Sequence, residues 1–333
     1  MLQRITSTPR RDLPALVTEL NRRAWNLGRF TVERHLLRRR FVERRIYDYR
    51  LLLDGDDPGI CRQLIRRGRR EAEQRFIVHN TLRSGQRVLD LGANVGYYTV
   101  MMARIVGPHG HVYAVEPHPA NFQLLQANVA LNGIEDRTSL QPIAIGASDG
   151  LQPLWATDHS NWHSFHKPTL DAHEPWLHKY QRKVMGHLDV ETRTLDTYLA
   201  DKPPIDFLRM DLEGYEVEIL RGLPDRHSPH VLFETHPEFY DHGGEDMRKV
   251  LEELCARRGY CIKLLVSDFD SGTAAYPDIE PARAVFERRG YGDAHVVAHF
   301  RSRSIYSGVR TDDAIELICR AEQVNAALLA PSR

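Results

Sequence analysis

The stretch VLDLGANVGYYT, from Val88 to Thr99, decides the fold. An apolar run leads directly into closely spaced glycines, and the residues after Gly96 have helical spacing, so we expect a strand, a tight turn and a helix. A turn of this kind points backbone N–H groups at a ligand. The stretch therefore predicts a nucleotide-cofactor site within an α/β domain.

The glycine spacing separates two kinds of cofactor. A dinucleotide fingerprint reads GxGxxG and holds a pyrophosphate, whereas this turn reads DxGxNxG, with Asn94 in place of a glycine. The Asp90 carboxylate would repel a pyrophosphate but suits a cationic amino group. The next strand pattern ends on Glu116, an acid that can hold both hydroxyls of a ribose. Together these residues favour S-adenosylmethionine and disfavour a nicotinamide oxidoreductase.

Strand and helix patterns alternate on both sides of this turn. Expected strands cover 87–91, 111–116, 140–145, 205–211, 230–234, 261–266 and 295–300, and expected helices cover 95–106, 119–131, 213–222, 246–258 and 312–329. Such alternation predicts a mainly parallel sheet in an α/β fold. The alternation pauses between 150 and 192, where the chain is rich in His and Trp.

The first eighty residues differ in charge from the rest of the chain. They contain 19 arginines against 10 acids, although the formal net charge of the whole chain is zero. Hydrophobic spacing predicts helix over 10–50 and again over 60–80, with a short strand at 49–53. We expect residues 1–80 to form a basic, mainly helical region that acts as a lid or a dimer contact. The arginine clusters are typical of a solvated helix face and, less often, of a surface that meets an anion.

Composition excludes several classes of protein. The chain has no run of eighteen or more apolar residues, and charged side chains occupy the place of a secretory signal, so we expect a cytoplasmic protein with no membrane partner. Its cysteines, Cys61, Cys255, Cys261 and Cys319, have neither metal-ligand spacing nor the pattern of a disulfide framework.

Several ordered motifs resemble the FkbM family of S-adenosylmethionine-dependent methyltransferases. VLDLGANVGYYT is followed by VYAVEPHPANFQLLQANVALNG, PIAIGASDG, TRTLDTYL and IDFLRMDLEGYEVEILRG, and the resemblance covers roughly residues 50–240. It implies a class I methyltransferase (Rossmann-like) fold, with a seven-stranded, mostly parallel sheet that includes one antiparallel strand. It also implies O-methylation of a hydroxyl on a sugar or small natural product. We place the methyltransferase domain at 81–300 and a helical extension at 301–333.

The same resemblance, with the position of strand ends, assigns the cofactor site. The carboxyl ends of parallel strands share one rim, where ligands bind. We expect the cofactor to contact Glu71, Asp90, Gly92, Asn94, Gly96, Tyr97, Glu116, Pro117, Ala144 and Asp211. The assignment of Glu71 departs from the family, because Arg70 precedes it where an aromatic residue is common.

A hydroxyl acceptor also requires a base. His236 is the first candidate, because its ordinary pKa lies near neutrality and Glu234, two residues earlier, can orient it. A histidine that merely satisfies backbone groups at a strand end is the competing interpretation. Asp211 is the second candidate base. Glu213 combines a place near the methyl group with charge complementarity at a helix start.

We interpret residues 150–191 as a substrate loop. Its tryptophans, Trp155, Trp162 and Trp176, suit contact with a sugar or ring. Its histidines, His159, His163 and His166, raise the question of a metal, but Mg²⁺ prefers oxygen ligands, so we assign no metal ligand. Mg²⁺ dependence stays possible but is not favoured.

Two other functions fit the same cofactor fold. One is an RNA methyltransferase that grips phosphates with the basic N-terminal region, although no RNA-binding motif supports nucleic acid as a partner. The other is a non-catalytic cofactor-binding module. The preferred partner is a small-molecule or glycoside acceptor, with a homodimer possible.

Overall fold

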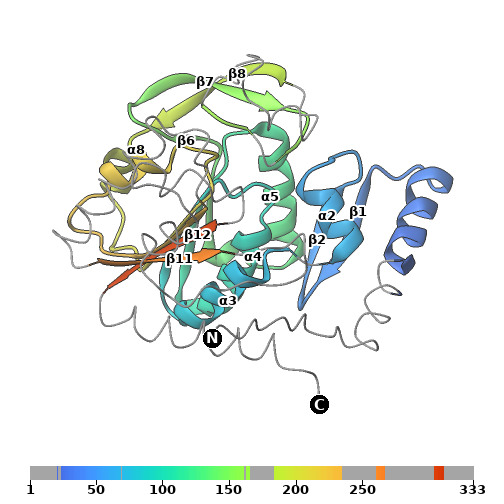
Figure 1. Ribbon diagram of the computed structural model, residues 1–333, viewed down its shortest axis with the longest axis horizontal. Helices are drawn as coiled ribbons and strands as arrows, with labels where there is room; N and C mark the ends of the chain where they lie inside the picture. The colour runs from blue at the N-terminus through green and yellow to red at the C-terminus, as the bar shows by residue number, and fades with distance from the viewer. Residues whose placement is uncertain are drawn as a thin grey trace, which may run out of the picture.

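A central sheet organises the computed structural model (Figure 1). The structure describes residues 21, 24–68, 70–160, 163–165, 184–234, 260–266 and 304–310. The strands of this sheet are β3 Arg87–Leu91, β4 His111–Val115, β5 Thr138–Gln141, β9 Phe207–Met210, β10 His230–Glu234, β11 Tyr260–Val266 and β12 Ser304–Arg310. Their order is β11–β12–β10–β9–β3–β4–β5, in a seven-stranded sheet.

The strand directions confirm the expected fold class. Strands β5, β4, β3, β9 and β10 run parallel, and β12 is antiparallel to both of its neighbours. The expected strand 295–300 lies outside the described residues. The antiparallel strand is instead β12, which pairs with β11 along its whole length. The sheet therefore extends into the segment 301–333, which the sequence assigned to a helical extension.

The helices follow the expected alternation. They are α2 Ile60–Arg67, α3 Ala72–Thr81, α4 Tyr97–Val106, α5 Pro119–Leu131, α7 Leu195–Leu199 and α8 Glu216–Arg221, with short turns at η1 Val32–Leu36, η2 Gly107–His109 and η3 Glu135–Arg137. The expected helices 246–258 and 312–329 lie outside the described residues. Within the described residues, no helix has the length and apolarity that a membrane crossing needs.

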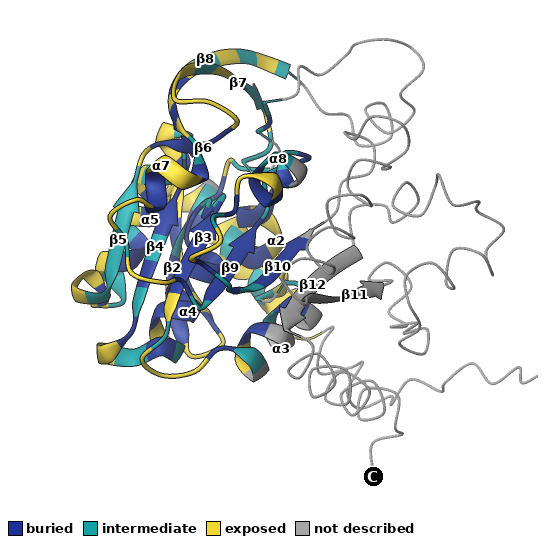
Figure 2. Cartoon of the chain, turned by 90° about the vertical axis from the view of Figure 1, so that its left-hand side faces the viewer, coloured by how far each residue is buried: buried dark blue, intermediate teal, exposed yellow. Residues whose placement is uncertain are grey.

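The two faces of the sheet carry separate cores, and the strands β3 and β9 between them are coloured as buried in Figure 2. Val88 and Phe207 point into the core formed with α4 and α5, whereas their neighbours Leu89 and Leu208 point into the core formed with α7 and α8. Because successive strand residues face opposite sides, polar residues two positions after Val88 and Phe207 face α4. This periodicity places the charged residues of the rim.

The N-terminal region contains a hairpin where the sequence predicted helix. Strand β1, Phe41–Ile46, pairs antiparallel with β2, Tyr49–Asp54. The burial of β1 alternates, with Val42, Arg44 and Ile46 inward. The apolar pattern missed this strand because a charged residue takes one of its inward positions. The strand expected at 49–53 is confirmed.

A small second sheet stands over one end of the central sheet (Figure 1). It consists of β6 Ala144–Ile145, β8 Val184–Arg193 and β7 Gly150–Thr157. The expected loop 150–191 therefore begins and ends in paired strands, and its residues 161–162 and 166–183 lie outside the described part. The run expected at 140–145 is split between the two sheets at Pro142, which cannot donate a backbone hydrogen bond.

Candidate active site

The glycine turn after β3 has the conformation that its sequence predicts. Gly92, Asn94 and Gly96 all have positive φ, at 75°, 51° and 88°. The backbone N–H groups of Gly92 and Ala93 both donate to the Val115 carbonyl at 3.0 Å. This fixes the turn against the end of β4, and α4 begins at Tyr97, two residues later than expected.

Glu116 lies at the end of β4 and is almost fully buried, at 4% exposure. Its Oε2 accepts a hydrogen bond from the Asn94 backbone N–H at 2.8 Å, and its Oε1 accepts one from the His118 backbone N–H at 2.9 Å. The Asn121 amide donates to Oε1 at 3.4 Å. The carboxylate is therefore held by the turn and by the start of α5, as a ribose-binding acid requires.

The environment of Glu116 predicts a pH dependence of stability. Burial raises the pKa of Glu116 from its ordinary value of 4.5 to about 7. The hydrogen bonds from the backbone N–H groups of His118 and Asn94 lower the pKa but only partly offset the effect of burial. An acid whose pKa rises on folding stabilises the protein at low pH, and this contribution disappears as pH increases through the folded-state pKa.

We therefore expect the free energy of unfolding of the wild type to decline between about pH 4.5 and 7, and Glu116→Gln to remove part of that decline. Urea unfolding across this range measures the effect. An equal decline in both proteins would contradict the assignment.

Asp90 is buried and does not line the pocket described below. Its side chain has no exposed surface; Oδ1 lies 3.4 Å from Arg209 Nη1, and Oδ2 accepts a hydrogen bond from Thr99 Oγ1 at 2.6 Å. Burial raises the pKa of Asp90, and Arg209 opposes that rise. The structure thus gives Asp90 a protein cation as its partner, and a direct contact between Asp90 and the cofactor stays a prediction.

A pocket at the rim joins many of the predicted site residues. Its walls include seven of them: Gly92, Asn94, Glu116, Pro117, Ala144, Asp211 and Glu213. Glu71, Asp90, Gly96 and Tyr97 do not line it. Tyr97 packs in the core against the hairpin and donates from its hydroxyl to the Arg70 carbonyl at 2.7 Å. Glu71 pairs with Arg70 and accepts a hydrogen bond from the Tyr98 hydroxyl.

Residues after β7 close one side of this pocket. The Ser160 carbonyl accepts from the side-chain amides of Asn94 and Asn121, each at 2.8 Å. The Ser160 backbone N–H and hydroxyl donate to Asp57, at 3.0 and 2.8 Å. These contacts of Ser160, which we call the Ser160 strap, join residues that are far apart in the chain, so they could not be predicted from the sequence.

His163 also lines the pocket and stacks on His118, with ring centroids 4.1 Å apart. Burial and the nearby His118 lower the pKa of His163 to about 3. His163 is therefore neutral at physiological pH.

The acids after β9 have distinct positions. Glu213 is buried at 6% exposure with φ of 50°, in a turn before α8, so α8 begins three residues later than expected. Ser164 donates to the Glu213 carbonyl at 2.9 Å. Glu216, which sequence reasoning missed, accepts from the Leu212 backbone N–H at 2.9 Å and shapes the turn.

The proposed base is not placed by the structure. Glu234 ends β10, next to β9, whereas His236 lies outside the described residues. Among the residues that the structure describes, no group of three or more His, Cys, Asp or Glu side chains is arranged to hold a metal ion.

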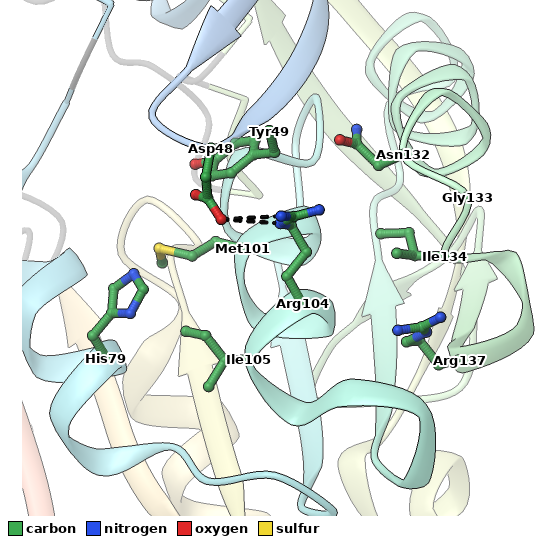
Figure 3. Close-up of a pocket in the computed structure, with 10 residues that line it drawn as sticks. All are labelled: Asp48, Tyr49, His79, Met101, Arg104, Ile105, Asn132, Gly133, Ile134 and Arg137. Atoms are coloured by element: carbon green, nitrogen blue, oxygen red, sulfur yellow. Dashed lines mark hydrogen bonds and ion pairs between the residues drawn. The ribbon is translucent and has the colours of Figure 1, made fainter.

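A second cavity, of about 430 Å³, lies between the turn of the β1–β2 hairpin, α3 and α4 (Figure 3). It shares no lining residue with the rim pocket. Its acid, Asp48, accepts from Arg104 at 3.1 Å. Arg104 and Ile105 lie near the C-terminal end of α4, away from the glycine turn, so this cavity is separate from the candidate active site.

Part of this chain is similar to known proteins. A family model described as the methyltransferase FkbM domain matches residues 90–262. Methyltransferase 1 of Beauveria bassiana is 28% identical over 155 residues, which cover 42% of this chain and 59% of the relative. Methyltransferase sdnD of Sordaria araneosa is 27% identical over 159 residues, which cover 42% of this chain and 61% of the relative. The match thus spans less than two thirds of either relative.

Among solved structures, an O-methyltransferase from Bacillus cereus in complex with SAH is similar at 12% identity. The similarity covers 73% of this chain and 83% of that chain, with a TM-score of 0.38. The fold assignment rests on the strand order of this chain.

Proposed function

Because the chain belongs to the FkbM methyltransferase family, we propose that it is an S-adenosylmethionine-dependent O-methyltransferase. The methyl acceptor in this proposal is a hydroxyl of a sugar or small natural product. The observation that carries the proposal is Glu116, a buried carboxylate at the end of β4 that the glycine turn holds by a backbone hydrogen bond.

The rim residues fit this cofactor. Glu116 offers carboxylate oxygens to ribose hydroxyls, and Pro117 and Ala144 supply an apolar wall for an adenine ring. Gly92 has no side chain where a Cβ would meet the Asp211 carbonyl, so the turn and β9 approach closely. When bound, S-adenosylmethionine supplies an electrophilic methyl group on a sulfonium.

Two aromatic residues of the pocket suit an acceptor. Phe165 and Tyr215 both line it, with ring centroids 5.3 Å apart, and can pack against the apolar face of a sugar or ring. Asp211 also lines the pocket, where a carboxylate can accept the proton that a hydroxyl loses as its new bond forms. His236 remains the alternative base. Closure by the Ser160 strap would exclude water from the transfer.

The test of this proposal is methyl transfer from labelled S-adenosylmethionine to separate pools of glycosides, phenols and RNA, at low and high salt. We expect label in a hydroxyl-bearing small molecule, with a rate that changes little with salt. Label confined to RNA, with a rate that falls steeply as salt rises, would establish the RNA alternative. Cofactor binding without transfer to any pool would support a non-catalytic module.

A further inference from the structure

Arg209 is a buried cation at the centre of the rim. It belongs to β9 and is 4% exposed. In the register of the sheet it lies directly opposite Asp90 of β3. A buried charge is costly unless neighbouring groups compensate it, so its contacts indicate what the site requires.

The guanidinium joins three parts of the rim. Nη2 donates to Asp211 Oδ2 at 2.9 Å, and Nη1 donates to the Gly92 carbonyl at 3.1 Å. Nη1 also lies 3.4 Å from Asp90 Oδ1. One side chain thus connects the end of β3, the glycine turn and the acid after β9, and two of these three partners line the pocket.

The remaining neighbours of Arg209 come from α4 and from the segment before α3. Its guanidinium carbon lies 4.3 Å from the ring centroid of Tyr98, whose hydroxyl donates to Glu71 at 2.7 Å. Although burial lowers the pKa of Arg209, Asp211 and Asp90 raise it above its ordinary value. Burial raises the pKa of Tyr98, which stays neutral. Arg209 therefore remains a cation among three carboxylates.

We propose that Arg209 is a positioning residue of the methyl-transfer site: it fixes Asp211 and the Gly92 carbonyl relative to each other and compensates the charges of the buried Asp90 and the partly exposed Asp211. This inference rests on the proposed function. Without the guanidinium, the buried Asp90 carboxylate would lie near the Asp211 carboxylate with no cation beside either, and at least one of the two would take up a proton near neutral pH.

The test compares two substitutions of Arg209 with a matched control. Arg209→Met keeps an unbranched side chain without the charge, whereas Arg209→Lys keeps the charge but lacks the planar guanidinium that can donate to several acceptors at once. Arg44→Met is the control, because Arg44 is 5% exposed, pairs with Glu33 and lies in β1, away from the rim. Urea unfolding without cofactor across neutral pH, and calorimetric titration with S-adenosylhomocysteine, provide the two measurements.

Arg209→Met should lose stability relative to wild type as pH rises through neutrality. Its folding equilibrium constant should fall by up to about tenfold per pH unit for each proton released, since an acid with a raised folded-state pKa stabilises only below that pKa. In the Arg209→Met background, the second substitution Asp90→Asn should reduce the dependence of the folding equilibrium constant on pH. Affinity for S-adenosylhomocysteine should fall on the order of tenfold in Arg209→Met, recover in part in Arg209→Lys, and stay at the wild-type value in Arg44→Met.

Unchanged affinity in Arg209→Met, or an equal loss in Arg44→Met, would overturn the positioning role. A stability difference that does not vary with pH would overturn the charge compensation. A wild-type chain that binds no S-adenosylhomocysteine would overturn the proposed function and the positioning role with it, and that failure is recognisable because it appears before any substitution is made.

Discussion

Gly92→Ala should disrupt the rim, at a cost of about 2–5 kcal/mol in the free energy of unfolding. Gly92 has φ of 75°, and a Cβ there would lie 2.2 Å from the backbone oxygen of Asp211. The backbone of Asp211 cannot move aside as a flexible side chain would. The glycine turn and the end of β9 must therefore separate to accommodate the added methyl group. We also expect the variant to lose measurable binding of S-adenosylmethionine. Urea unfolding and calorimetric titration measure the two effects.

Gly133→Ala is the matched control for Gly92→Ala. Gly133 also has positive φ, at 61°, but a Cβ there would meet no atom within 4 Å. Its substitution should cost only the strain of a left-handed residue, about 1–2 kcal/mol, and should leave cofactor affinity unchanged. Equal losses of stability in the two variants would contradict the close approach of the glycine turn to β9.

Glu116→Ala should weaken binding of S-adenosylmethionine by about 100-fold or more. The variant loses two hydrogen bonds from ribose hydroxyls to a charged acceptor, each of which contributes about 1.5–3 kcal/mol. It also leaves the buried N–H groups of Asn94 and His118 without their acceptor, so we expect some loss of stability with folding retained.

Glu135→Ala removes an exposed acid from η3 and serves as the control for Glu116→Ala. Both variants should unfold cooperatively, and only Glu116→Ala should lose the cofactor. Wild-type affinity in a folded Glu116→Ala protein would remove this residue from the site.

Much of the fold could be predicted because parallel strands are buried on both faces. The apolar runs of β3 and β4 and the spacing of α5 each identify one element, and their alternation specifies the sheet. The hairpin was predicted only in part, because Arg44 occupies an inward position of β1. In the sequence, an inward-facing arginine cannot be distinguished from an exposed one. The structure shows that Arg44 faces inward because it pairs with Glu33.

The residues that line the candidate site could be predicted where local sequence determines position. Glu116 follows an apolar strand, and Gly92 and Asn94 stand in one turn, so the sequence brings them to one rim. Arg209 was missed because its role depends on strand register, which places it opposite Asp90 from a distant part of the chain. Ser160 was missed for a similar reason, since its hydrogen bonds reach back to Asp57.

The central claim is that the rim holds S-adenosylmethionine, and the most direct test is calorimetric titration of the purified wild-type protein. S-adenosylmethionine, S-adenosylhomocysteine and NAD should be titrated separately, with and without Mg²⁺. We predict saturable binding of the first two and none of NAD. Binding of NAD alone would contradict the cofactor assignment made from the glycine turn and Glu116.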